Sequence, residues 1–221
     1  MIKFHFDNKK QTVTLCKSTS QGNAFASVLL SGFGTCVSAR FSFQQQEMRA
    51  VEMVFAQVSN AINSVITSDS RGDLHFAGTH IADALRKVNE QLWSVSKASG
   101  QGLYVSGVVF YWIEDKYLLF PFGGAAAYSV GAEALRQQGS HESPDGLIYD
   151  ALGGSMKWPG KCWNGNFPKG SRMFLTSEPI LDLESALSQV RAAGADHPNT
   201  ASVLRQSQKF PLDAVIEIYN D

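Results

Sequence analysis

The first 43 residues alternate between apolar and polar side chains, as in Ile2–Phe6 and Thr12–Leu15. The alternation is interrupted at Asn8-Lys9 and again between Ser18 and Gly22. Because successive side chains of a strand point to opposite faces, this pattern is typical of half-buried strands separated by turns. It predicts three or four strands joined in hairpins.

The spacing of apolar residues changes at Gln44, where two stripes with intervals of three and four begin. The first stripe consists of Met48, Val51, Phe55, Val58, Ile62 and Val65, and the second of Ile81, Leu85, Val88, Leu92 and Val95. Such intervals place the apolar side chains on one face of a helix. We therefore expect two helices between Gln44 and Lys97, packed antiparallel on one face of a sheet.

Strand patterns return in the second half of the chain, at Val105–Ile113, Tyr117–Phe122 and Ala126–Val130. Their continuous apolar runs predict burial on both faces. A segment rich in Gly, Pro and Trp, from Gly139 to Gly170, reads as a loop. The remaining predicted elements are a strand at Arg172–Thr176, a helix from near Asp182 to Gly194, a short helix from Asn199 and a last strand at Ala214–Tyr219.

Strands that are grouped in blocks around paired helices favour antiparallel sheets over a strictly alternating α/β arrangement. The predicted fold class is therefore α+β, a four-layer α-β-β-α sandwich of two antiparallel sheets flanked by helices. The chain has 221 residues and shows no internal repeat or linker. We expect a single domain over residues 1–221.

The 19 basic residues nearly balance the 20 acidic ones and form no run, which argues against nucleic acid and membrane surfaces as partners. The longest apolar stretch has about 11 residues, whereas a helix needs roughly 20 to span a bilayer. The alternation at Ile2–Phe6 is unlike a secretion signal. Cys16, Cys36 and Cys162 are odd in number and far apart, as suits reduced thiols, so a cytoplasmic location is expected.

Six short motifs follow one another along the chain. They are Gln21-Gly22-Asn23-Ala24-Phe25, Leu29-Leu30-Ser31-Gly32-Phe33-Gly34-Thr35, Gly123-Gly124-Ala125-Ala126-Ala127-Tyr128, Ala151-Leu152-Gly153, Lys169 to Asp182, and Pro211-Leu212-Asp213-Ala214-Val215-Ile216. In this order they resemble the motifs of the PPM-type (type 2C) metal-dependent serine/threonine protein phosphatases. The resemblance implies the four-layer fold. It also implies a chemistry in which carboxylates hold two divalent ions that activate a water for attack on a phosphoserine or phosphothreonine.

The positions that the resemblance assigns to metal ligands hold Asn23, Ser31, Glu178 and Pro211. The flanking motif residues are Gly32, Gly124 and Asp182. Only Glu178 among the four ligand positions is a carboxylate, and divalent ions are usually held by several. The resemblance therefore implies a degenerate member of the family, with no catalytic residue, no bound metal and no other cofactor.

We interpret the chain as a catalytically inactive phosphatase-like protein that acts as a binding or regulatory module in bacterial serine/threonine phospho-signalling. The implied partner is a protein, for example a serine/threonine kinase or its substrate. One alternative is an active Mn- or Mg-dependent phosphatase that uses Glu178, Asp182, Asn23 and Asp213 in an altered site. Another is a structural protein of a larger assembly.

Two features have both a structural and a functional interpretation. Trp158, Lys161 and Trp163 lie close together in the predicted loop, where large aromatic side chains either plug the edge of a domain or mark a partner-binding patch. Glu178 and Asp182 flank the start of a predicted helix, where acids either cap the helix or remain as metal ligands.

Overall fold

The computed structural model describes residues 2–6, 11–17, 23–28, 33–40, most of 50–130, 135–139, most of 151–193, and 214–220. In the first four strands, and in the last one apart from Ile218, it describes the backbone alone. All the strand pairs within this part of the chain are antiparallel, as predicted.

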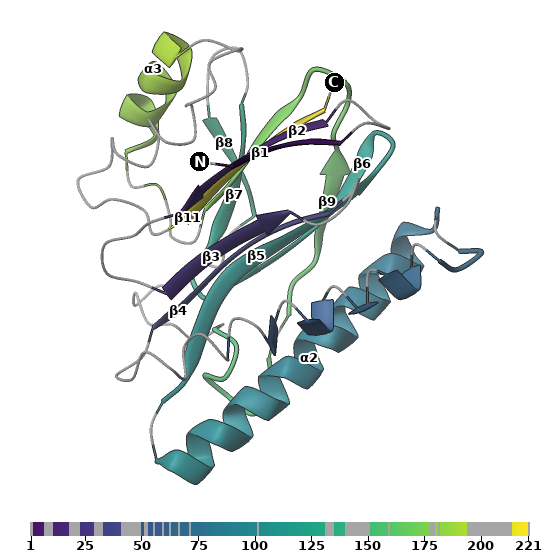
Figure 1. Ribbon diagram of the computed structural model, residues 1–221, viewed down its shortest axis with the longest axis vertical. Helices are drawn as coiled ribbons and strands as arrows, with labels where there is room; N and C mark the ends of the chain where they lie inside the picture. Colours follow the sequence, from purple (N-terminus) through teal and green to yellow (C-terminus); the bar gives the residue numbers. More distant parts are fainter. Residues whose placement is uncertain are drawn as a thin grey trace.

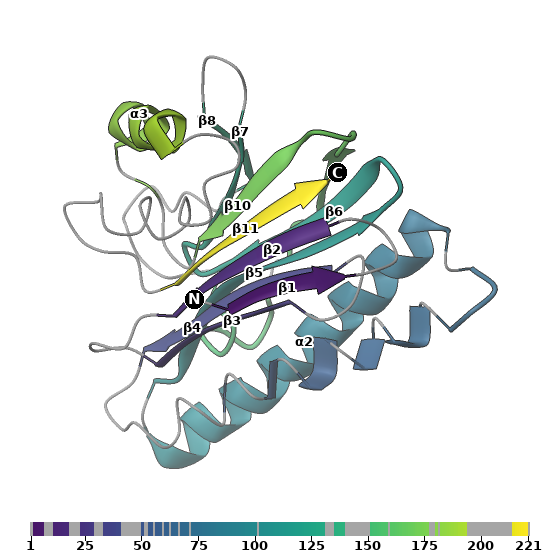
Figure 2. The same cartoon turned by 45° about the horizontal axis from the view of Figure 1, so that its top comes forward.

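The described strands form two sheets (Figures 1 and 2). The six-stranded sheet has the order β1 (Ile2–Phe6), β2 (Gln11–Lys17), β11 (Ala214–Asn220), β10 (Arg172–Thr176), β7 (Ala126–Val130) and β8 (Leu135–Gly139). The five-stranded sheet has the order β3 (Asn23–Val28), β4 (Phe33–Arg40), β5 (Tyr104–Ile113), β6 (Lys116–Phe122) and β9 (Trp163–Asn166). Because β2 pairs with β11, the two ends of the chain meet in one sheet.

The long helix α2 (Leu74–Ser99) has well-defined ends. The Asp73 side chain accepts hydrogen bonds from the amides of His75 and Phe76, at 2.8 and 3.3 Å. These bonds satisfy two amides that lack a partner within the helix. At the other end Gly100 adopts a left-handed conformation with φ of 67°, which ends the helix at little steric cost.

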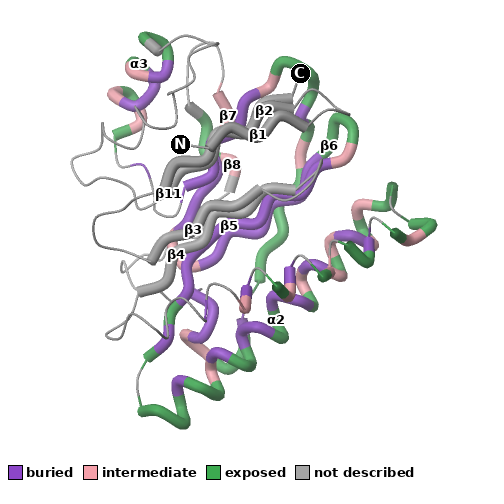
Figure 3. The backbone as a smooth tube through the Cα atoms, in the orientation of Figure 1, coloured by how far each residue is buried: buried purple, intermediate pink, exposed green. Residues whose placement is uncertain are grey.

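Three buried clusters define the order of the layers, and the burial pattern is visible in Figure 3. In the first cluster, α2 and the helical residues between 50 and 65 pack on the outer face of β5 and β6. The second lies between the sheets and joins β5 and β6 to β7, β10 and β11. The third joins β7 and β10 to α3 (Leu183–Ala193). The four-layer α-β-β-α sandwich is thus confirmed.

The sequence prediction was wrong in one segment. The supposed loop from Gly139 to Gly170 contains β9, and Leu152 forms an isolated bridge with Val105. Strand β8, which ends at Gly139, was not predicted either. The predicted short helix from Asn199 lies outside the described residues. No helix in the described part of the chain is long and apolar enough to cross a membrane.

Candidate functional site

The first predicted motif and the Gly123-Gly124 turn lie at the same end of the sandwich. Asn23 begins β3 and pairs with Ala39, which in turn pairs with Val105 of β5. Two residues further along β5, Gly107 pairs with Phe122, the last residue of β6. The Gly123-Gly124 turn follows Phe122 directly and leads into β7 in the other sheet. The register therefore brings the Asn23 backbone and Gly124 to one end of the sandwich.

Three strands of the other sheet begin or end here as well. Thr176, the last residue of β10, pairs with Ala126 at the start of β7 and with Val215 near the start of β11. The buried Thr176 hydroxyl donates to the Ala126 carbonyl, at 3.3 Å. Glu178 and Pro211, which flank these strand ends in sequence, lie outside the described residues, so their place in the site stays a prediction.

Ser31 and Gly32 also lie outside the described residues, but the register of the strands around them bears on the prediction. Strands β3 and β4 meet at their Val28 and Gly34 ends, which is the end of the hairpin opposite to Asn23. The place of Ser31 in the site stays a prediction. The residue that does lie beside Asn23 is Ala39, followed by Arg40 at the end of β4.

Asp182 caps the helix that follows the fifth motif. Its Oδ1 atom accepts a hydrogen bond from the Ser185 amide, at 2.9 Å, at the start of α3. The chain before the cap is held by Tyr128, whose hydroxyl accepts a bond from the Ile180 amide, at 2.8 Å. Burial raises the pKa of Tyr128, and the bond from Ile180 lowers it in part. The capping interpretation of Asp182 therefore agrees with the structure.

The Ala151-Leu152-Gly153 motif ties α2 to the sheet. The Leu152 and Val105 backbones exchange two hydrogen bonds of 3.0 Å. The buried Asn89 side chain of α2 accepts a bond from the Gly153 amide at 2.8 Å and donates to the Ser155 carbonyl at 3.0 Å. Because Asn89 satisfies backbone groups that would otherwise be buried without partners, this motif has a structural role.

The two tryptophans of the 158–163 segment differ: one fills the edge of the domain and the other is exposed to a possible partner. Trp158 is buried in the cluster under α2, with its ring edge-on to Phe122 at 6.4 Å between centroids. It plugs the edge of the domain. Trp163 begins β9 and is 39% exposed, and Lys161 is exposed beside it. Trp163 and Lys161 are thus available to a partner.

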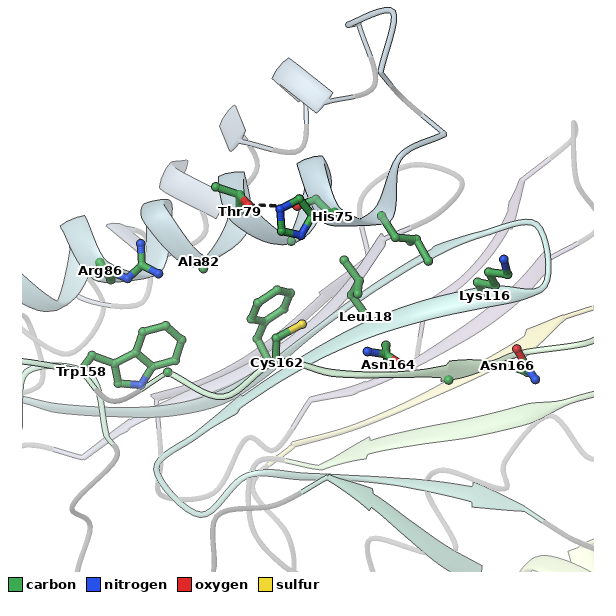
Figure 4. Close-up of a pocket in the computed structure, with 15 residues that line it drawn as sticks. His75, Thr79, Ala82, Arg86, Lys116, Leu118, Trp158, Cys162, Asn164 and Asn166 are labelled. Carbon is green, nitrogen blue, oxygen red and sulfur yellow. Dashed lines mark hydrogen bonds between the residues drawn. The ribbon is translucent and has the colours of Figure 1, made fainter.

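A groove of about 680 Å³ lies between α2 and the β6–β9 edge of the five-stranded sheet (Figure 4). Its walls come from three separate segments, namely the first half of α2, strand β6 and residues 158–166. The sequence reasoning missed it. The available signal was the alternation at 158, 160, 162, 164 and 166, which places these residues on one face of an extended chain.

The thiol of Cys162 lines this groove. Cys162 is exposed as a residue, but the protein around its sulfur partly desolvates it, which raises the pKa of Cys162 from an ordinary 9.0 to about 11, and the Leu119 backbone lowers it in part. Because only the thiolate reacts, a raised pKa moves the onset of reaction to higher pH.

We expect iodoacetamide to label Cys162 about a hundredfold more slowly in the folded protein at pH 8 than in urea-unfolded chains. Peptide mapping by mass spectrometry measures the rate at this residue alone. In the folded protein the rate should still rise toward pH 11, whereas in unfolded chains it should level off near 9. Equal rates in the two states at pH 8 would contradict the burial of the sulfur.

No group of three or more His, Cys, Asp or Glu side chains suited to a metal ion is found among the described residues. At the end of the sandwich where the motifs meet, the described residues are Asn23, Ala39, Arg40, Gly124 and Thr176. None of them is a carboxylate. The carboxylates nearby in sequence are Glu178 and Asp213, both outside the described part, and Asp182, whose oxygen is used by the α3 cap.

Comparison with known proteins finds similarity at the level of structure. No family model and no curated protein matches the chain. The structure resembles a serine/threonine phosphatase from S. agalactiae, with a TM-score of 0.75, 10% identity and coverage of 96% of this chain and 100% of that one.

Two further solved structures are similar over nearly the whole chain. The Mycobacterium tuberculosis serine/threonine phosphatase PstP/Ppp has a TM-score of 0.67 and 13% identity, with coverage of 94% of this chain and 96% of that one. PppA of Pseudomonas aeruginosa has a TM-score of 0.73 and 9% identity, with coverage of 96% and 97%. A Mycobacterium smegmatis structure with a TM-score of 0.70 is itself described as a PPM Ser-Thr phosphatase. The chain therefore has the fold of the PPM-type serine/threonine phosphatases.

Proposed function

We propose that this chain is a phosphatase-fold protein without metal-dependent catalysis, which acts in the cytoplasm by binding a protein partner. The observation that carries the proposal is the chemistry of the strand ends. Where the motifs meet, none of the described residues Asn23, Ala39, Arg40, Gly124 and Thr176 is a carboxylate by residue type.

These donors do not fit a pair of divalent ions. The catalytic domain of PstP, which shares this fold at a TM-score of 0.68, was solved in complex with two manganese ions. In the present chain the positions that the motif resemblance assigns to metal ligands are Asn23, Ser31, Glu178 and Pro211. Mn²⁺ and Mg²⁺ are hard ions whose charge is offset mainly by carboxylates, and a single Glu offsets little of it.

The proposed lack of a metal pair does not depend on the register of the second motif. If the hairpin register is followed, the residues beside Asn23 are Ala39 and Arg40 in place of Ser31. Neither Ala39 nor Arg40 is a carboxylate. In both assignments Glu178 is the one carboxylate among the four ligand positions, which is less negative charge than a metal pair usually has.

A binding role fits what remains of the molecule. PppA, which has the same fold, is described as a key regulatory component of the type VI secretion system. In the present chain several large apolar side chains are exposed, among them Met156 at 70% and Trp163 at 39%. Exposed methionine and tryptophan side chains are frequent in protein interfaces. We propose a serine/threonine kinase or one of its substrates as the partner.

The test is an assay of phosphate release from a phosphoserine peptide and from a small aryl phosphate, over Mn²⁺ and Mg²⁺ concentrations up to the millimolar range. We expect no release above the buffer background, because the ions that would activate the water are not held. Turnover that a chelator abolishes, and that Glu178→Ala also abolishes, would contradict the proposal and favour an active phosphatase with an altered site.

A further inference from the structure

The groove beside α2 is built from three regular faces. The helix contributes residues spaced by about four, such as His75, Thr79 and Arg86, which lie on one side of it. Strand β6 contributes Lys116, Leu118 and Phe120, and the β9 segment contributes Cys162, Asn164 and Asn166, each spaced by two. Figure 4 shows these side chains on both sides of the same space. The groove therefore runs along β9.

Strand β9 is an edge strand. It pairs with β6, from Lys116–Asn166 to Leu119–Trp163, and no described strand pairs with its other side. Edge strands expose unpaired backbone groups that can accept a further strand, unless lysine, proline or a bulge protects them. The sequence of β9 is Trp163-Asn-Gly-Asn166; it contains no lysine, proline or bulge, and its short length of four residues is the one protecting feature that it has. It is therefore competent to pair with an extended segment of another chain.

The two faces of β9 differ in chemistry. Asn164 and Asn166 face the groove, whereas Trp163 is on the opposite face, where Phe167 further along the chain enters the core between the sheets. Trp163 is 39% exposed. A strand added beside β9 would alternate in the same way, so every second side chain would lie over the groove and the others beside Trp163.

The charged side chains that line the groove favour a partner segment of opposite charge. Lys116 and Arg86 line the groove, and no carboxylate is among the described residues that do so. Asp83 pairs with Arg86 from the same helix. Within the described part of the chain, the Lys116 ammonium forms no hydrogen bond and no ion pair. Lys161 is exposed next to Cys162 in sequence, but it does not line the groove.

We propose that β9 and the adjoining groove bind an extended segment of a partner protein, in which acidic and apolar residues alternate. The segment adds a strand to the free edge of β9, as in other cases of strand addition. Its carboxylates lie over the groove near Lys116 and Arg86, and its apolar side chains cover Trp163. This assignment rests on the proposed binding function and names the surface and the partner chemistry.

The test uses a fluorescein-labelled peptide of about eight residues in which Asp and Val alternate, the length of a short strand. Binding to the full chain is followed by fluorescence anisotropy. One control peptide has the same composition with Asp and Val in separate blocks, and another carries N-methyl groups at alternate amides. We expect both controls to bind at least tenfold more weakly, because one loses the register of its charges and the other its backbone bonds.

Two protein variants locate the site. Lys116→Glu reverses an exposed charge in the groove and is expected to weaken binding about tenfold, with a smaller effect at high salt. Lys87→Glu is the matched control, since Lys87 is exposed on α2 but does not line the groove. It should leave the affinity unchanged. Both side chains are exposed, so both variants should keep the melting temperature of the parent.

Three outcomes would overturn the assignment. They are no binding of the alternating peptide, equal weakening by Lys116→Glu and Lys87→Glu, and a preference for a phosphoserine version over the Asp peptide. The phosphate-release assay is independent of these results. If the peptide does not bind and no phosphate is released, only the groove assignment is rejected. If the peptide binds and the protein also shows metal-dependent turnover, only the proposed loss of catalysis is rejected.

Discussion

Gly153→Ala is expected to lower the stability of the protein by about 3 kcal/mol or more. Gly153 has a φ of 86°, and a Cβ atom placed on it would lie 2.2 Å from the Leu103 carbonyl oxygen and 3.0 Å from the Leu92 side chain. The obstructing carbonyl belongs to the backbone and cannot rotate away. Relief requires the 151–153 segment to move, which also breaks the 2.8 Å bond from the Gly153 amide to Asn89.

Thermal unfolding followed by circular dichroism measures this effect. For a chain of this size, 3 kcal/mol corresponds to a drop in Tm of roughly 6 to 12 °C. Gly124→Ala is the matched control, because Gly124 has a φ of 84° but a Cβ placed there meets nothing within 4 Å. It should cost only the strain of the positive φ, about 1 kcal/mol. Equal losses in the two variants would contradict the packing described around Gly153.

The core strands and helices were predictable because their sequence pattern and their environment agree. The apolar run Val105–Ile113 corresponds to β5, Tyr104–Ile113, and Arg172–Thr176 coincides with β10. Both strands lie between other layers, so nearly every side chain is buried and the pattern is continuous. The α3 boundaries were predictable for another reason, since Asp182 is a favourable N-cap and Gly194 a favourable helix end.

Strands β8 and β9 were not predictable in this way. Their sequences, Leu-Arg-Gln-Gln-Gly and Trp-Asn-Gly-Asn, contain few apolar residues. Both are edge strands, and each is defined by pairing with one neighbour. Strand β9 depends on a partner that is distant in sequence, β6, whereas β8 pairs with the preceding strand β7. The strand propensity of the residues themselves was therefore too weak to predict either strand.

The second motif shows the limit of matching by glycine spacing. The segment Leu29 to Thr35 resembles a glycine-containing motif of the phosphatases, and the strands on either side of it, β3 and β4, pair with each other. Glycine is favoured in many kinds of tight turn, so the spacing of glycines alone does not determine where a motif lies in the fold. The strand register was needed to show that Ala39 lies beside Asn23.

The groove beside α2 was missed for a related reason. Its residues range from Leu74 to Asn166, and each of the three contributing segments is unremarkable in sequence. Their juxtaposition follows from the placement of β9 next to β6 and from α2 lying across the same sheet. Because β9 itself was read as part of a loop, the face formed by Cys162, Asn164 and Asn166 could not be recognised.

The central claim concerns charge at the strand ends. If each lost carboxylate weakens a metal site by about 2 kcal/mol, the scale of one charge-assisted contact, three losses amount to roughly 6 kcal/mol. That corresponds to about four powers of ten in affinity. A site of micromolar affinity would then bind at about ten millimolar, so no ion would be held at the concentrations used for catalysis.

Isothermal titration calorimetry of the metal-free protein with Mn²⁺ tests this claim most directly. We predict no saturable heat up to about one millimolar, and the same flat trace for Glu178→Ala, because the wild-type protein has no occupied site for that substitution to remove. Saturable binding of two ions at micromolar concentration, lost in Glu178→Ala, would contradict the account and show that the chain retains a phosphatase metal centre.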